Sequence, residues 1–356
     1  GLCETEIDLS QISKLRWRMP FYEIRRSDLY ELKEQKEMKE IPIQAMHQFQ
    51  IGHAHDLEKG TGCTVILAKD GAVAGVDVRG GGPATRETDL LNPKNTVQQI
   101  HAVTLSGGSA FGLEASSGVM QYLSERKIGF DLKGIYIPIV CQASLFDCGL
   151  GDPKAFPDKA MGYQACLASE KEEISEGNVG AGCGASVGKA FGFDSAMKTG
   201  LGCYAMQVGE IQVGAIVAVN ACGDVYQANS TKRLAGAYNY HEHKAIDTVE
   251  ALLAGIESQS NPHQNTTIGC ILTNAKFDKA QMNKLASISH NAYAHCIHPV
   301  ATSNDGDTIF TMSSATVAAD PDIVGIMAVK AMEKAIEHAA KKAQSAFGLS
   351  SYADLL

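Results

Sequence analysis

The sequence predicts an α+β protein in which β-sheets pack together and helices cover their outer sides. Short β-rich segments gather in at least two groups, 64–67 with 73–78 and 202–208 with 213–220. Longer segments carry apolar residues three and four positions apart, which predicts amphipathic helices that bury one side. A chain of 356 residues, 45% of them hydrophobic, is long enough for a large core.

The first part of the chain is expected to lie outside this core. Residues 1–46 are charged and irregular, so we expect an N-terminal extension followed by one domain over 47–356. Within that domain, Lys69-Asp70-Gly71 separates the strands 64–67 and 73–78, which predicts a hairpin. The next expected elements are a helix over 109–123, a strand over 135–140 and a helix over 158–168.

After a glycine-rich polar stretch, 177–202, the second half of the domain is again expected to contain both strands and helices. Asp278 has a side chain typical of a helix N-cap, so a helix is expected from there to Cys296. The remaining expected elements are strands over 202–208, 213–220, 267–272 and 308–312, and helices over 240–256 and 322–346.

Composition excludes several classes of function. A net charge of −9 without any Lys/Arg-rich stretch argues against nucleic-acid binding. The ten cysteines form no C-x-x-C pair, which indicates reduced thiols in a cytoplasmic protein and neither a disulfide framework nor a zinc site. Neither a signal peptide nor an apolar run of about 20 residues is found, so no membrane span is expected. We expect no metal and no cofactor.

Two generic motifs are incomplete. Gly184-Ala185-Ser186-Val187-Gly188 has the letters of a hydrolase nucleophile elbow, but a glycine-rich loop precedes it where a strand is required. Gly188-Lys189 resembles the end of a P-loop, yet Cys183 and Ala190 occupy the positions that need glycine and Ser/Thr. Neither motif carries a function.

Asn304-Asp305-Gly306-Asp307-Thr308 allows two interpretations. Asp, Asn and Gly are common in turns, which is the simpler one. Alternatively, Asp305 and Asp307 form a carboxylate pair that orients a hydroxyl or amine nucleophile. Calcium is disfavoured, because the other ligands of an EF-hand loop are absent.

The junction Asn265-Thr266 has the layout of a self-cleavage site. It follows the polar loop 258–264 and opens the apolar run 268–272. Attack of Thr266 Oγ1 on the Asn265 carbonyl carbon would give an ester, and hydrolysis of that ester would leave Thr266 as a new N-terminus. Such a threonine carries nucleophile and base in one residue.

Ordered blocks over most of the chain, from about Ile51 to the terminal helix, resemble the P1 peptidases, formerly family S58. This family of N-terminal-nucleophile aminopeptidases includes L-aminopeptidase/D-esterases, β-peptidyl aminopeptidases and nylon-oligomer hydrolases. The blocks are Gly60-Thr61-Gly62-Cys63-Thr64-Val65, Gly75-Val76-Asp77-Val78-Arg79-Gly80-Gly81, Thr85-Arg86-Glu87-Thr88-Asp89-Leu90, Leu105-Ser106-Gly107-Gly108-Ser109-Ala110-Phe111-Gly112-Leu113, Gly180-Ala181-Gly182 and Asp305-Gly306-Asp307-Thr308.

The resemblance implies a four-layer αββα sandwich and cleavage between Asn265 and Thr266, with Thr267 as the alternative nucleophile. By the same matching, Asp305 and Asp307 support the nucleophile, Asn220 supplies an oxyanion-hole amide, and Lys189 lies near the acidic pair. From the residues alone, Asn220 is a strand-end turn residue and Lys189 a solvated lysine.

The resemblance also implies a substrate, a small peptide, amide or ester with a free amine, and a homotetramer of processed chains. Glu87 is a candidate partner for the substrate amine. Some relatives have tyrosine where this chain has Phe146, and that hydroxyl assists their oxyanion hole. Two other functions remain open: an acetyltransferase on the related ornithine acetyltransferase scaffold, and an uncleaved, non-enzymatic binding protein.

Overall fold

A computed structural model of the chain describes residues 37–171, 173–255 and 265–355. Most of the expected N-terminal extension and the loop 258–264 lie outside these residues. Met38–Leu356 forms one compact unit. Residues 38–46 belong to this unit, because β1 (Met38–Ile41) pairs with β11 (Leu201–Val208), and the side chains of Ile43 and Met46 are buried.

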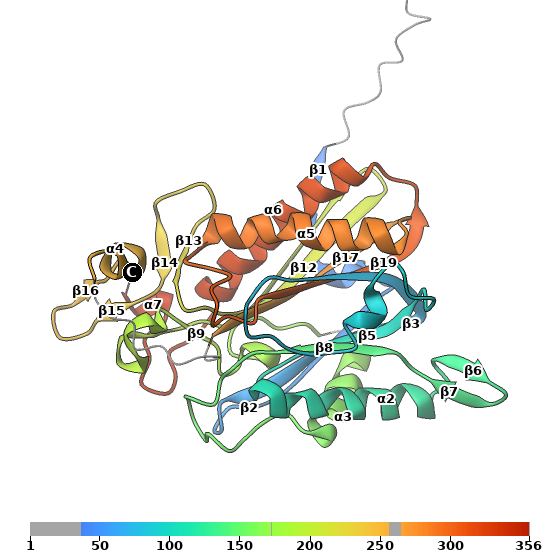
Figure 1. Ribbon diagram of the computed structural model, residues 1–356, viewed down its shortest axis with the longest axis horizontal. Helices are drawn as coiled ribbons and strands as arrows, with labels where there is room; N and C mark the ends of the chain where they lie inside the picture. The colour runs from blue at the N-terminus through green and yellow to red at the C-terminus, as the bar shows by residue number, and fades with distance from the viewer. Residues whose placement is uncertain (1–36, 172, 256–264, 356) are drawn as a thin grey trace, which may run out of the picture. The chain divides into compact units, whose positions relative to one another are not determined.

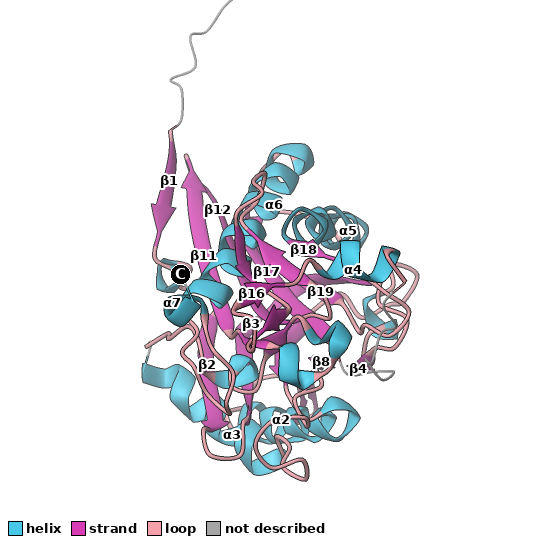
Figure 2. Cartoon of the chain, turned by 90° about the vertical axis from the view of Figure 1, so that its left-hand side faces the viewer, coloured by secondary structure: helices cyan, strands magenta, loops and turns pink. Residues whose placement is uncertain are grey.

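Two β-layers lie face to face in this unit, with helices on both outer sides (Figures 1 and 2). The first layer contains β1, β11, β12 (Ile211–Asn220), β17 (Thr266–Ala275) and β19 (Thr308–Val317), in that order. The second contains β2 (Gln50–Asp56), β5 (Ile100–Ser106), β8 (Val140–Ser144) and β4 (Ala84–Arg86). Strand β3 (Thr61–Val78) joins the two layers.

The predicted hairpin at Lys69-Asp70-Gly71 is wrong. This segment lies inside the single long strand β3, whose first half pairs with β2 and β5 and whose second half, from Val73, pairs with β19. The register with β5 shifts between Leu67 and Ala72, and Gly71 has a φ of 81°. The glycine therefore bends the strand from one layer into the other.

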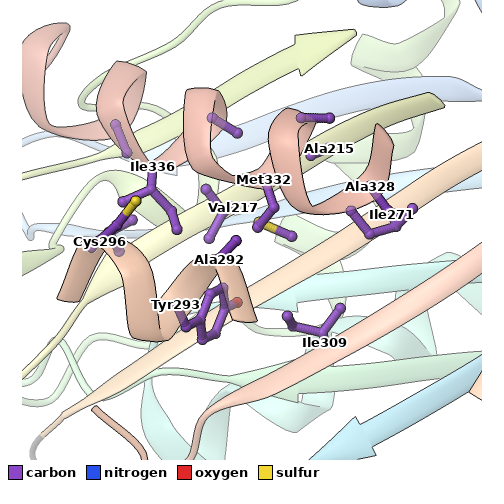
Figure 3. Packing of buried hydrophobic residues seen from close by; sticks show 14 of the residues in the cluster. Ala215, Val217, Ile271, Ala292, Tyr293, Cys296, Ile309, Ala328, Met332 and Ile336 are labelled. Atoms are coloured by element: carbon purple, nitrogen blue, oxygen red, sulfur yellow. The ribbon is translucent and has the colours of Figure 1, made fainter. Parts of the chain in front are cut away.

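Helices cover the first layer on its outer side. They are α5 (Lys279–Cys296) and α6 (Pro321–Lys341), and a capping box between Asp278 and Gln281 begins α5 as the sequence predicts. Figure 3 shows this layer, where Met332 and Ile336 of α6 lie in one buried cluster with Val217 of β12. The buried alternate residues of the strands thus face the helices.

The second layer is covered by α2 (Ala115–Glu125) and α3 (Lys159–Ala168) (Figure 1). A third buried cluster, including Leu105, Ile268 and Phe310, lies between the two β-layers. Buried clusters thus lie under α5 and α6, between the two β-layers, and under α2 and α3, which is the predicted αββα order. The helix expected over 109–123 begins as a 3-10 turn, Ser109–Glu114, and the strand expected over 135–140 is divided into β7 (Ile135–Ile137) and β8.

The helix predicted over 240–256 is also wrong within its described part. Tyr238–Asn239 (β15) and Lys244–Ala245 (β16) pair as a small hairpin, and only Thr248–Leu253 (α4) is helical. Asp247 caps α4 by accepting a hydrogen bond from the Glu250 N–H. The polar residues around 240–247 thus form turns, and the helix begins at its cap.

Smaller elements complete the described unit. Among its helices, none is long and apolar enough to cross a membrane. No disulfide joins the described cysteines. The short elements are β6 (Phe130–Leu132), β9 (Ser186–Val187), β10 (Met197–Lys198), β13 (Asp224–Tyr226), β14 (Arg233–Ala235), β18 (Ile297–His298) and α7 (Tyr352–Leu355).

Candidate active site

Strand ends bring the predicted residues together at one edge of the inter-layer core. Asn220 is the last residue of β12, Thr266 is the first of β17, and the two are direct partners in the antiparallel ladder. Asp305 and Asp307 immediately precede β19, which runs parallel to β17. All four residues are buried. Positions 220, 266, 305 and 307, far apart in sequence, therefore form one cluster.

The strand's alternation separates the two candidate nucleophiles. Ile268 and Cys270 of β17 belong to the core between the layers, whereas Ile271 belongs to the core under α5 and α6. Since successive side chains point to opposite faces, Thr266 lies on the inter-layer face and Thr267 on the helix-facing side. The ladder places Asn220 on the same face as Thr266. The geometry thus pairs Asn220 with Thr266.

The Thr266 hydroxyl lies against the peptide bond that precedes it. Its Oγ1 contacts the carbonyl oxygen of Asn265 and accepts a hydrogen bond of 3.1 Å from the Gly306 N–H. The side chain of Asn265 is fully buried, and neither its Oδ1 nor its Nδ2 has a hydrogen-bond partner among the described residues. A buried amide without partners costs about 1–3 kcal/mol, so the junction of Asn265 and Thr266 is destabilised locally.

The two carboxylates have different partners. Asp307 Oδ1 accepts from the Thr267 N–H at 2.6 Å, and its Oδ2 accepts from the Ala301 N–H at 2.8 Å. Asp305 Oδ2 accepts from the Thr302 N–H at 2.7 Å, whereas its buried Oδ1 has no partner within the described chain. Asp307 therefore fixes the backbone beside Thr266, and Asp305 keeps a free acceptor.

Burial changes the protonation of this pair. Burial and then the charge of Asp305 raise the pKa of Asp307 to about 7. Burial also raises the pKa of Asp305, against the opposing effects of the Thr302 hydrogen bonds and the Lys189 charge. Two neighbouring carboxylates away from water resist simultaneous ionisation, so this pair holds a proton more readily than two exposed aspartates would.

Lys189 is buried, contrary to its interpretation as a solvated lysine. Its Nζ donates to Asn220 Oδ1 at 2.7 Å and to the Asn220 carbonyl oxygen at 3.1 Å. Burial lowers the pKa of Lys189 to about 7, opposed by the nearby charges of Cys222, Asp305 and Asp147. The ammonium is thus poised to change charge near neutral pH.

Asn220 is held in a single orientation. Its Oδ1 also accepts from the Ser186 N–H at 3.1 Å, and its Nδ2 donates to the carbonyl oxygen of Phe146 at 2.8 Å. Two donors define the oxygen end of the amide, so the amide cannot flip without losing both bonds. The second Nδ2 hydrogen remains available for another acceptor.

Phe146 and Glu87, the other two residues predicted from the resemblance, differ in position. Phe146 is half-buried and adjoins the cluster through its carbonyl oxygen. Glu87 is an exposed residue after β4, and its described hydrogen bond uses its main-chain oxygen, which accepts from Cys141 Sγ. The structure therefore brings Phe146, but not Glu87, into contact with the cluster.

The glycine run Gly80-Gly81-Gly82 holds the loop that carries Asp305 and Asp307, a role not predicted from the sequence. The N–H groups of these glycines donate to the carbonyl oxygens of Asp307, Thr302 and Asp305. A Cβ on Gly80 would lie 2.3 Å from the Asp305 carbonyl oxygen, so only glycine allows this approach. The glycine run was a visible signal for a close backbone contact.

No three His, Cys, Asp or Glu side chains gather as metal ligands within the described residues. The arrangement instead combines a hydroxyl nucleophile beside a carbonyl, a fixed amide donor and three titratable side chains. These are the components of acyl transfer through a covalent ester.

Relatives by sequence are peptidases and amide hydrolases. A model of the family described as Peptidase family S58 matches residues 43–351. An uncharacterised aminopeptidase of Mycobacterium leprae is 34% identical over 337 residues, covering 85% of this chain and 91% of its own length. A 6-aminohexanoate-oligomer endohydrolase of Paenarthrobacter ureafaciens is 32% identical over 271 residues, covering 74% of this chain and 72% of its own.

Solved structures share the fold at lower identity. An L-aminopeptidase D-Ala-esterase/amidase from Ochrobactrum anthropi, described as a variant of the Ntn hydrolase fold, has a TM-score of 0.62 and 18% identity, covering 83% of this chain and 84% of its own. A β-aminopeptidase from Burkholderia sp. has a TM-score of 0.61 and 17% identity, with coverages of 86% and 90%. These likenesses establish the Ntn-type fold expected from the sequence. Since the family model spans most of the sequence, the chain belongs to peptidase family S58.

Proposed function

We propose that this S58 hydrolase cleaves itself between Asn265 and Thr266 and then uses Thr266 to hydrolyse small peptides, amides or esters that carry a free amine. The observation that carries the proposal is the position of Thr266 Oγ1, between the Asn265 carbonyl group and the Gly306 N–H. Asn220 lies on the same face of the sheet as Thr266, which gives the reaction an amide donor.

Self-cleavage begins when Thr266 Oγ1 attacks the carbonyl carbon of Asn265 and loses its proton to a base. Asp305, which has a free acceptor oxygen, is the group available as this base, while Lys189 interacts with it electrostatically and donates to the Asn220 amide. The C–N bond then breaks, and the nitrogen takes a proton to become the α-amine. Water hydrolyses the ester, leaving a carboxylate on Asn265 and restoring the hydroxyl of Thr266.

The burial pattern favours this direction. Cleavage frees the unpartnered Asn265 side chain from its buried position, removing a cost of about 1–3 kcal/mol. The new α-amine of Thr266 forms next to the Thr267 N–H that Asp307 binds, and Asp305, in the same cluster, has a free acceptor. These carboxylates are suited to hold the amine.

Turnover repeats the same chemistry on a substrate. The α-amine, with an ordinary pKa of about 8, takes the Oγ1 proton as Oγ1 attacks the substrate carbonyl. The Asn220 amide stabilises the oxyanion, the amine returns the proton to the leaving group, and water hydrolyses the acyl ester on Thr266. The similarity to an uncharacterised aminopeptidase and to a 6-aminohexanoate-oligomer endohydrolase supports substrates of this class.

A pair of adjacent threonine variants tests the proposal. Thr266→Ala should stay intact on a denaturing gel and inactive on a panel of dipeptides, amino-acid amides and 6-aminohexanoate oligomers. Thr267→Ala, the matched control, should still yield fragments 1–265 and 266–356 by mass spectrometry. Cleavage of Thr266→Ala at wild-type rate would refute Thr266 as the nucleophile.

The same preparations separate the other two functions. Acetyl transfer from N-acetylornithine without hydrolysis of the amide panel would favour an acetyltransferase. An intact wild-type chain without either activity would favour a binding protein.

A further inference from the structure

A buried carboxylate outside the predicted set lies near the segments that hold Asn220. Asp147 follows β8 and is 1% exposed. Its Oδ1 accepts from the Gly108 N–H at 2.7 Å, and its Oδ2 accepts from Thr61 Oγ1 at 2.8 Å. A Cβ on Gly107 would lie 1.8 Å from Asp147 Oδ2, so the chain leaves space for this carboxylate.

The three partners of the Asn220 amide all connect to Asp147. Phe146, whose carbonyl oxygen accepts from Nδ2, is its neighbour in the chain. Ser186, whose N–H binds Oδ1, lies two residues after Gly184, where a Cβ would be 2.6 Å from Asp147 Cβ. Lys189, the third partner, is close enough for its charge to interact with Asp147.

We propose that Asp147 is a positioning residue of this active site, which holds Phe146 and the 184–186 segment in place and keeps Lys189 positively charged, so that the Asn220 amide points its free N–H towards Thr266. The inference rests on the proposed function. A positive Lys189 polarises the amide that it binds, and a charge-assisted hydrogen bond of this kind is roughly twice as strong as a neutral one. Asp147 therefore acts through Lys189 and does not touch the reacting atoms.

Several charges surround the pair. Lys189 is faced by Cys222, Asp305, Asp147 and, with the opposite effect, Lys198. Asp147 also acts on Cys148, Cys183 and Lys198. Burial raises the pKa of Asp147 to about 6, which leaves it mostly ionised at neutral pH. The loss of this charge lowers the pKa of Lys189, because one of the carboxylates that favour the ammonium is gone.

Asp147→Asn tests the inference with little change of shape. The amide oxygen can still accept from the Gly108 N–H, and the amide nitrogen can donate to Thr61 Oγ1. We follow the rate of self-cleavage by mass spectrometry from pH 5 to 9. In Asp147→Asn, the fall of this rate at alkaline pH should begin about one pH unit lower than in the wild type. At pH 8 this is about a tenfold lower rate. Hydrolysis by the cleaved fraction should show lower kcat with little change in KM.

Asp224→Asn is the matched control. Asp224 is equally buried and accepts from the Ala237 and Thr248 N–H groups, but its cationic partner is Arg233. Asp224→Asn should keep the alkaline limb of the wild-type pH–rate profile, which is the fall in self-cleavage rate above neutral pH. This holds whatever the folding stability of the variant. If Asp147→Asn also keeps that limb, or if both variants move it equally, the inference is refuted.

A second variant covers misfolding of Asp147→Asn. Thr61→Val removes one hydrogen bond that favours the ionised Asp147, so it should move the alkaline limb in the same direction by a smaller amount; no movement refutes the inference. Absence of cleavage and activity in the wild-type chain would refute the proposed function itself. A cleaved, active wild type with an unmoved limb in these variants would refute only the role of Asp147.

Discussion

The space around Gly306 gives a sharp test of where the attack begins. A Cβ at this position would lie 2.7 Å from Thr266 Oγ1, and 3.2 Å from both the Gly82 carbonyl oxygen and Pro83 Cα. Gly306 does not have a positive φ, so alanine can adopt its backbone conformation. Gly306→Ala therefore removes neither the N–H nor the loop geometry, and it crowds mainly the nucleophile.

The size of the effect follows from the contact. A close carbon–oxygen approach is about 3.3 Å, so Thr266 Oγ1 must move by about 0.6 Å or rotate away from the Gly306 N–H. Misplacement by about 1 Å costs up to a hundredfold in rate, and losing the hydrogen bond costs about 1 kcal/mol. We expect self-cleavage of Gly306→Ala to be about ten- to a hundredfold slower than in the wild type.

The assay follows the intact chain and its two fragments by mass spectrometry, alongside thermal unfolding. Gly325→Ala is the matched control, because its Cβ would meet Ile288 at an ordinary 3.4 Å, and alanine in a helix is favoured by about 0.5–1 kcal/mol. The control should cleave normally and melt slightly higher. Wild-type cleavage by a folded Gly306→Ala would contradict attack from the observed position of Thr266 Oγ1.

Three further perturbations test the neighbouring groups. Lys189→Met should slow self-cleavage and turnover at least tenfold without lowering the melting temperature much, since the variant also removes the cost of burying an ammonium; wild-type rates would exclude Lys189 from the mechanism. Between about pH 4 and 7, Asp307 binds a proton in the folded state that it does not bind in the unfolded state. Its contribution to folding stability therefore falls as pH rises through that range, and thermal melting of Asp307→Asn should lack this decline. Phe146→Tyr should cleave itself at the wild-type rate, because Phe146 holds Asn220 through its main-chain oxygen; a mass-spectrometric time course showing slower cleavage would contradict this.

Local sequence signals predicted several helices and strands at their observed positions. The N-cap residue Asp278 predicted the start of α5, and the β-rich segments 202–208 and 213–220 predicted β11 and β12. The wrong predictions arose where the same residue pattern is compatible with two different local structures. Gly71 with a positive φ can end a strand in a turn or bend it, and pairing with β19 and β5 decided for the bend.

The clustering of the candidate residues was predictable from the sequence, whereas their burial and charges were not. Thr266, Asn220, Asp305 and Asp307 were predicted as site residues through the family resemblance, and the structure places them in one buried cluster. The burial of Lys189 depends on acceptors on Asn220, which the chain alone does not place beside it. Asp147 was not predicted for the same reason, since its hydrogen-bond partners, Thr61 and Gly108, come from two distant segments.

Strand register, more than any motif, distinguishes the two threonines at the junction. A shift of β17 by one residue against β12 would turn Thr267 towards Asn220 and Thr266 towards α5 and α6. The same shift would move Ile268 and Cys270 out of the inter-layer core and expose that core to the wrong side chains. The apolar residues that follow the junction therefore fix which hydroxyl meets the Asn265 carbonyl. The proposal of Thr266 as the nucleophile thus rests on the packing of the whole strand.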